Sequence, residues 1–114
     1  METIVVQRLR FTIPSVDIMA EKYYRVVFDM NGIDITDREM QLIVHTALNK
    51  GIDKEGFCKV YGTSAPTVNN MISRLKKMSV FVKEGGKLSI SPFLALDFEK
   101  DIKLEIFFNK DYGE

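Results

Sequence analysis

The pattern of hydrophobic and polar positions changes character at Pro14. Residues 4–13 are rich in β-branched side chains, include a few polar ones, and stop at that proline. Proline cannot continue a ladder of backbone hydrogen bonds. The first segment is therefore predicted to be a strand that ends at residue 13.

Beyond Pro14 the apolar residues recur at helical spacing. This predicts a helix that Ser15 caps and that ends at Asn31-Gly32. The alternative is a β-hairpin, because residues 23–30 are β-rich and Asn-Gly favours a type I′ turn. The helix is preferred because its pattern persists from residue 16 to residue 30. Its predicted apolar face comprises Val16, Met19, Ala20, Tyr23, Val26, Val27 and Met30.

A capping box at Thr36-Asp37-Arg38-Glu39 predicts the start of the next helix. In such a box the threonine hydroxyl accepts from the glutamate N–H, and the glutamate carboxylate accepts from the threonine N–H. The segment Asn49-Lys50-Gly51 predicts where this helix ends. Its apolar face is expected to comprise Met40, Ile43, Val44, Ala47 and Leu48.

Two further helices are predicted from their caps. Asp53 caps a short helix that runs through Tyr61 and is closed by Gly62. Ser64 then caps another, with Pro66 in the first turn, where its missing N–H costs nothing. The short helix has Phe57, Val60 and Tyr61 as apolar residues, and the last has Val68, Met71 or Ile72, Leu75 and Met78 as its buried stripe.

The remainder of the chain returns to β-type patterns. Residues 80–83 and 87–91 form a predicted hairpin around the turn Glu84-Gly85-Gly86, and Pro92 stops it. Ile102, Leu104, Ile106 and Phe108 alternate with Lys103, Glu105 and Phe107, which predicts one more strand.

Composition limits the class of protein. A chain of 114 residues with 46% apolar and 28% charged side chains should fold around one core, as a single domain over 1–114. Its apolar runs are short and its start lacks the features of a signal peptide, so a soluble protein without a membrane partner is expected. The single cysteine, Cys58, fits a reducing compartment, and a cytoplasmic location is predicted.

Charge is neutral overall but uneven along the chain. Sixteen Lys and Arg balance sixteen Asp and Glu. Residues 53–91 hold seven basic and three acidic side chains, a net charge of +4. Residues 1–52 carry six against seven, and residues 92–114 carry three against six. The basic middle directs attention to the helices and hairpin it contains.

The stretch from Phe57 to Asn70 resembles the helix-turn-helix of many bacterial and bacteriophage regulators. Those families favour a small residue at the position of Cys58, glycine at Gly62, and Ser-x-x-Thr-Val where Ser64 to Val68 stand. Thr63 and Ser79 depart from the pattern, which usually has an apolar residue and a glycine there. The resemblance implies an α+β winged helix-turn-helix domain over residues 36–91, with a strand and helix added in 1–35 and a strand in 92–114.

The same resemblance implies sequence-specific binding of double-stranded DNA, with helix 65–78 in the major groove and wing 80–91 on the backbone. Asn69 and Asn70 are the leading base-reading candidates, because asparagine pairs with adenine. The alternative is that Asn69 and Asn70 belong to a solvent-exposed helix face without a ligand. The cations in the last turn would then be explained by the helix dipole alone. The candidate DNA-binding residues are Ser64, Ala65, Thr67, Asn69, Asn70, Ser73, Arg74, Lys77, Lys83 and Lys87, with Lys76 as a further phosphate contact.

No enzymatic machinery is expected. His45 stands alone on the charged side of its helix, and Cys58 is interpreted as a packed small residue. No cluster has metal-ligand spacing, and Gly85-Gly86 lacks the pattern of a phosphate loop. Asp97, Glu99 and Asp101 are read as a solvated acidic loop. Neither a cofactor nor a metal is predicted.

Two functions from different classes remain open. The first is transcriptional regulation by a dimer, with the 16–30 helix and the strand ending in Phe107 and Phe108 assigned to self-association. The second is a bacteriophage assembly, virion or DNA-packaging component that uses the fold to bind a phage or host protein. The second is suggested by a faint resemblance of residues 88–94 and the terminal strand to small winged-helix proteins of tailed phages.

Overall fold

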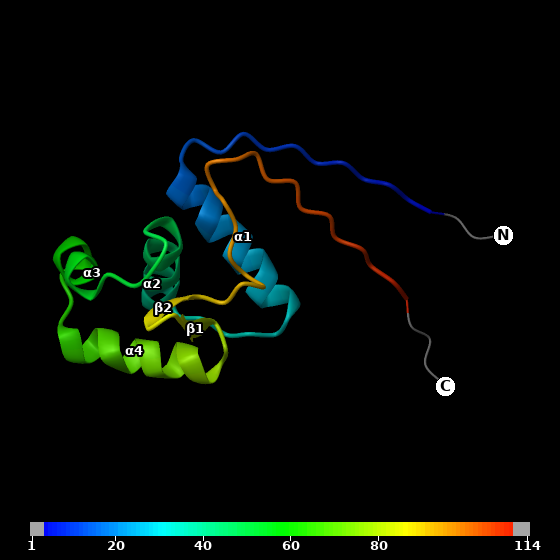
Figure 1. The fold of residues 1–114 in the computed structure, drawn as a ribbon. Coiled ribbons are helices and arrows are strands. Elements are labelled where there is room, and N and C mark those ends of the chain that lie inside the picture. Colours follow the sequence, from blue (N-terminus) through cyan, green and yellow to red (C-terminus); the bar gives the residue numbers. More distant parts are fainter. Residues whose placement is uncertain (1–3, 111–114) are drawn as a thin grey trace, which may run out of the picture.

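The structure, a computed structural model that describes residues 4–110, contains four helices and one two-stranded hairpin. All four predicted helices and the predicted hairpin are confirmed. The order is compatible with a winged-helix-like α+β layout (Figure 1). The elements are α1 (Val16–Met30), α2 (Asp37–Leu48), α3 (Lys54–Tyr61), α4 (Ala65–Lys77), β1 (Phe81–Glu84) and β2 (Lys87–Ile90).

Local capping residues determine where three of the helices begin. Thr36 and Glu39 form both hydrogen bonds of the predicted capping box. The Asp53 carboxylate accepts from the Gly56 N–H at 3.0 Å, and the Ser64 hydroxyl accepts from the Thr67 N–H at 3.4 Å. Such a cap stabilises a helix by about 1 kcal/mol. Ser15 occupies the predicted cap of α1, but its side chain makes no capping hydrogen bond.

One apolar core joins the helices to the hairpin. Helix α2 packs against both α1 and β2, and α4 contacts both α3 and β1. The chain then returns to α1, where the Phe98 ring meets Tyr23 and Tyr24 edge-on at 5.8 and 5.7 Å. The fully buried large side chains include Tyr24, Phe28, Phe57, Phe81, Met40, Leu42, Ile43, Leu75 and Val68.

The predicted apolar face of α1 is wrong in part. The buried residues are Ala20, Tyr24 and Phe28, whereas Val16 and Met30, the two ends of the predicted face, are exposed. The helix is rotated because Tyr24 stacks on Phe28 within α1 and meets Phe98 from the far end of the chain.

Two other predicted apolar positions lie on the surface. Val60 of α3 is 68% exposed and Leu48 is at the exposed end of α2. In α3, Phe57 alone is buried, because a helix of eight residues turns only one narrow stripe toward the core. The predicted stripe of α4 is confirmed by Val68, Ile72 and Leu75, while Met71 and Met78 are half-buried.

The hairpin has a tighter turn than the predicted one. Glu84 pairs with Lys87, which leaves Gly85-Gly86 as a two-residue turn. Both glycines have positive φ, at 55° and 80°, as a type I′ turn requires. A backbone hydrogen bond from the Ile52 N–H to the Leu88 carbonyl, at 3.0 Å, ties the outer edge of β2 to the loop before α3.

The predicted terminal strands are both wrong. Residues 4–13 and 101–110, called here the N-terminal arm and the C-terminal arm, have no regular secondary structure. Figure 1 shows both leaving the same side of the body. Over these two ranges neither arm makes a backbone hydrogen bond, and a strand is defined by its pairing with another.

A candidate nucleic-acid interface

Helix α4 turns one face into the core and leaves the other open. Val68, Ile72 and Leu75 are buried, while every α4 residue predicted to contact DNA is exposed. Figure 1 shows α4 along the lower edge of the body, with α2 and α3 on the side away from that edge. The exposed predicted residues are Ser64, Ala65, Thr67, Asn69, Asn70, Ser73, Arg74 and Lys77.

Helical geometry ranks these residues by how directly they face outward. Successive residues of a helix are about 100° apart, so a line spaced by four, three and four residues follows one face. The line opposite the buried stripe consists of Pro66, Asn70, Ser73 and Lys77. Asn69 lies to one side of it. Of the two predicted base readers, Asn70 therefore occupies the centre of the exposed face.

The open face is polar and carries no negative charge. Helix α4 contains no Asp or Glu, and its last turn holds Arg74, Lys76 and Lys77. Cations at this end are also favoured by the helix dipole, so their presence alone does not require a ligand. The absence of any carboxylate across the rest of α4 is what makes the face suited to an anion such as DNA.

Arg74 has a structural partner. Its Nη1 donates to the Glu39 carboxylate, and its Nη2 donates to the Asp34 carbonyl at 2.9 Å. These contacts tie α4 to the segment that begins α2. Arg74 was predicted to contact a phosphate, but its guanidinium is directed toward Glu39, so we leave it out of the proposed interface.

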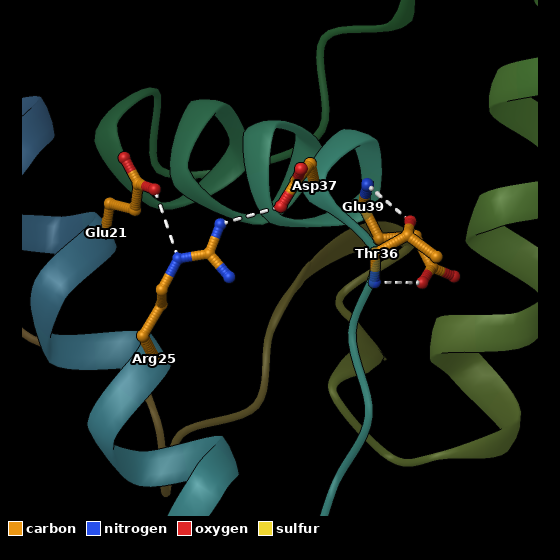
Figure 2. A network of polar contacts seen from close by, with 5 residues as sticks. All are labelled: Glu21, Arg25, Thr36, Asp37 and Glu39. Atoms are coloured by element: carbon orange, nitrogen blue, oxygen red, sulfur yellow. Dashed lines mark hydrogen bonds and ion pairs between the residues drawn. The ribbon is translucent and has the colours of Figure 1, made fainter.

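Glu39 is the buried member of this ion pair. Figure 2 shows its carboxylate accepting from the Thr36 N–H, at 2.9 Å, as part of the capping box. Burial opposes ionisation of this carboxyl. The hydrogen bonds from Thr36 and Arg74 outweigh that effect and hold the pKa of Glu39 below its ordinary value. The ionised Glu39 therefore neutralises the charge of Arg74, one of the cations of α4.

The two predicted wing lysines lie on opposite faces of the hairpin. Lys83 is across from Leu88, and Lys87 is across from Glu84. Residues directly opposite share a face and neighbours along a strand do not. A three-residue turn would have put Lys83 across from Lys87, so the tighter turn moves one of them to the other face. Lys87 also has an acidic residue, Glu84, as its cross-strand partner.

The connection between α3 and α4 is held in place at several points. Gly62 adopts the left-handed conformation, with φ 61°, as the resemblance to helix-turn-helix proteins implies. The Thr63 N–H donates to the Cys58 carbonyl at 3.3 Å, and Arg38 donates to the Tyr61 carbonyl at 2.9 Å. Cys58 is half-buried against the core, in line with its interpretation as a packed small residue.

At the end of α4, Ser79 occupies a position where the helix-turn-helix families usually have glycine. Ser79 has φ 61°, a conformation that glycine adopts at much lower cost. The position therefore has the backbone that a glycine would favour, although a serine occupies it.

A second ion-paired network joins α1 to α2. Arg25 lies between Glu21 and Asp37, with N–O distances of 3.2 and 3.0 Å (Figure 2). These groups line a polar cavity of about 330 Å³. Because these ion-paired side chains are largely exposed, they add little to the apolar packing of Ala20, Tyr24 and Phe28 that positions α1.

The expected position of His45, on the charged side of its helix, is wrong. Its ring packs edge-on against Phe57 and Tyr61, at 5.7 and 6.5 Å, and its Nδ1 is buried without a hydrogen-bond partner in the described structure. It belongs to the junction of α2 and α3 rather than to a charged surface. Across residues 4–110 there is no group of three or more His, Cys, Asp or Glu placed to hold a metal ion.

Comparison with protein-family models, with curated proteins and with solved structures finds no match to this chain. Within the described range, none of the helices combines the length and apolar composition needed to cross a bilayer.

Proposed function

We propose that this chain binds double-stranded DNA in a sequence-specific way and regulates transcription. The observation that carries the proposal is the outer face of α4, which is open to solvent, contains no carboxylate and centres on Asn70 and Lys77. A helix of this kind fits the major groove, which is about 12 Å wide.

Asn70 is the proposed base reader. The asparagine amide offers a donor and an acceptor that match the N7 and N6 groups of adenine. Its position on the central line of α4 allows it to reach the base edges, while the flanking side chains meet the backbone. Asn69, to one side, is the proposed second contact.

Four lysines supply the proposed phosphate contacts: Lys76 and Lys77 on α4, and Lys83 and Lys87 on the hairpin. Each neutralised phosphate contributes about −0.9 to the slope of log K against log salt, so all four predict a slope of about −3 to −4. Because the two hairpin lysines lie on opposite faces, we expect a slope closer to about −3 than to about −4.

The test is a binding titration followed by sequence selection. The protein is titrated against a random-sequence duplex at several salt concentrations, and bound duplexes are then enriched from a random pool and sequenced. We expect Lys77→Ala to weaken binding to every duplex and to reduce the salt slope by about 1. Asn70→Ala should instead relax selectivity at one base, by about 1–3 kcal/mol.

The matched control is Lys22→Ala, an exposed lysine on α1 away from α4. It should leave both affinity and slope unchanged. The proposal fails if no duplex is retained at low salt, or if Lys22→Ala is as damaging as Lys77→Ala.

A second candidate is a role in bacteriophage assembly, the virion or DNA packaging, through protein contacts. The exposed apolar residues of the two arms favour it, because such surfaces usually mark protein–protein contacts. A protein that fails to retain DNA at low salt would support this candidate over the first.

A further inference from the structure

The two arms hold most of the apolar surface that the described chain leaves exposed. Among residues 4–110, nine of the sixteen large hydrophobic side chains with high exposure lie in them. Phe11 is 76% exposed and Phe108 is 82% exposed. Monomeric proteins rarely leave apolar surface of this extent in one place, and larger exposed patches usually mark interaction sites.

Each arm has the alternating pattern of a half-buried strand over the part nearest the body, residues 8–13 and 102–106. In the N-terminal arm the odd positions from Val5 to Ile13 are apolar apart from Gln7, and Arg8 and Arg10 lie on the opposite face. In the C-terminal arm the apolar residues lie at even positions instead. These are Ile102, Leu104, Ile106 and Phe108. Extended backbone with this pattern is suited to a sheet with one covered face.

The arms are arranged for antiparallel pairing with each other. One enters the body and the other leaves it, and both extend from the same side (Figure 1). At their bases, Ile13 and Ile102 are both half-buried, which makes them the natural first pair.

Pairing Ile13 with Ile102 fixes the rest of the register. Phe11 then faces Leu104, and Leu9 faces Ile106, all on one side of the ribbon. On the other side Arg10 faces Glu105, an opposite-charge pair of the kind that stabilises antiparallel strands. Within residues 4–110 Glu105 is exposed and its one ion pair is with Lys103, at 3.5 Å, so it is available for this exchange.

A ribbon of two strands is only marginally stable in water, since one apolar face remains uncovered. That explains why the arms of a single chain are unpaired. A second ribbon of the same sequence would cover the face, because a two-fold contact brings identical apolar patches together. The side chains on this face offer on the order of 600 Å² per chain. This approaches the roughly 800 Å² per partner of a stable interface.

We infer that the arms are a self-association device: residues 4–13 and 101–110 pair as an antiparallel ribbon, and the ribbon of a second copy of this chain covers its apolar face. The body of each copy, including α4, takes no part in this contact. The device is compatible with either candidate function.

The first test is the mass of the full-length protein in solution, by sedimentation equilibrium in the micromolar range. The wild type is expected to be a dimer. Leu9→Asp combined with Ile106→Asp should raise the dimer dissociation constant at least about a thousandfold, because four aliphatic side chains per dimer lose their burial. The matched control is Phe93→Asp, which changes a side chain that is 95% exposed outside the arms and should leave the dimer intact.

Because Leu9 and Ile106 are both exposed in the structure, the helical circular dichroism of the double variant should match the wild type. A wild type that stays monomeric throughout the micromolar range overturns the inference. So does a double variant that remains dimeric, or a Phe93→Asp variant that dissociates equally.

A charge exchange tests the register itself. Arg10→Glu alone places two carboxylates opposite each other and should weaken the dimer about tenfold, counting two such pairs per dimer. Adding Glu105→Arg should restore the wild-type affinity. Arg8→Glu with Glu105→Arg should give no such restoration, because Arg8 faces Phe107 in this register. Equal restoration by both combinations would contradict the proposed pairing.

Discussion

The helical body and the two arms contain similar proportions of apolar residues but differ in the structure these residues form. In the body, residues 15–98 form every helix and the hairpin that their patterns predict. In the arms, segments with equally clear β-type patterns remain unpaired and exposed. The difference lies in where the partners are. A helix satisfies its hydrogen bonds within its own residues, whereas a strand depends on another segment.

This comparison also separates the two proposed roles of the molecule. The body presents α4 as a rigid polar surface held by caps, a left-handed Gly62 and the Arg74–Glu39 pair. The arms present extended apolar surface that gains structure only on contact with something else. A polar rigid face suits recognition of DNA, and an extended apolar one suits association with protein.

The largest expected difference between body and arms concerns two phenylalanines. Phe57 of α3 is fully buried in the core, and Phe11 is exposed in the N-terminal arm. Phe57→Ala should lower the free energy of unfolding by about 3–5 kcal/mol through lost burial and a cavity. Phe11→Ala should change it by less than about 0.5 kcal/mol in the monomer. Urea unfolding at low protein concentration measures both, and a similar loss in the two variants would show that the arm packs on the body.

A smaller effect is expected where α2 and α4 are joined. Glu39→Gln keeps the shape of the capping box but removes the charge that Arg74 meets, and should cost about 1–2 kcal/mol at neutral pH. Because the pKa of Glu39 is lowered by folding, the ionised carboxylate stabilises the protein above its ordinary pKa. That stability is lost as the pH falls through the folded-state pKa.

Unfolding measured from neutral to acid pH checks this assignment. The wild type should lose stability in the acid range more steeply than Glu39→Gln, so that the two curves converge at low pH. Arg38→Ala, which removes a neighbouring arginine but leaves the carboxylate ionised, serves as the control and should retain the wild-type slope. Parallel curves for wild type and Glu39→Gln would contradict the assignment.

The elements of the body could be predicted because their signals are local. Thr36, Ser64 and Gly62 each act on residues within one helical turn, so the sequence is sufficient to place helix ends. The rotation of α1 could not be predicted in the same way. It depends on Phe98, which lies more than sixty residues after the end of that helix in the sequence and meets it only after folding.

The candidate site was also predictable only where its features depend on local sequence. The exposure of α4 follows from the spacing of Val68, Ile72 and Leu75, which the sequence already contains. The engagement of Arg74 by Glu39 joins positions 35 residues apart, and no local pattern reveals it. The opposite faces of Lys83 and Lys87 depend on a one-residue difference in the turn, the kind of detail that alternation alone does not fix.

At the end of α4 a substitution should stabilise the protein. Ser79→Gly removes the cost of a side chain in the left-handed conformation and should raise the free energy of unfolding by about 1 kcal/mol. The matched control is Ser73→Gly, an exposed serine inside the same helix, which should lower it by a few tenths of a kcal/mol or more. Thermal and urea unfolding show whether each substitution raises or lowers the free energy of unfolding. A loss of stability in both variants would mean that the Ser79 side chain contributes a contact beyond its backbone.

The smallest expected effect distinguishes the two faces of the hairpin. Lys83 has Leu88 as its cross-strand neighbour, while Lys87 has the acidic residue Glu84. If DNA binds as proposed, Lys83→Ala should therefore reduce the salt slope by up to about 1, and Lys87→Ala by less. Glu84→Gln provides the internal check, because it removes the negative charge of the residue opposite Lys87 and should strengthen binding slightly, most clearly at low salt. Equal losses from the two lysine variants, with no gain from Glu84→Gln, would show that the hairpin contacts the duplex through its tip rather than through one face.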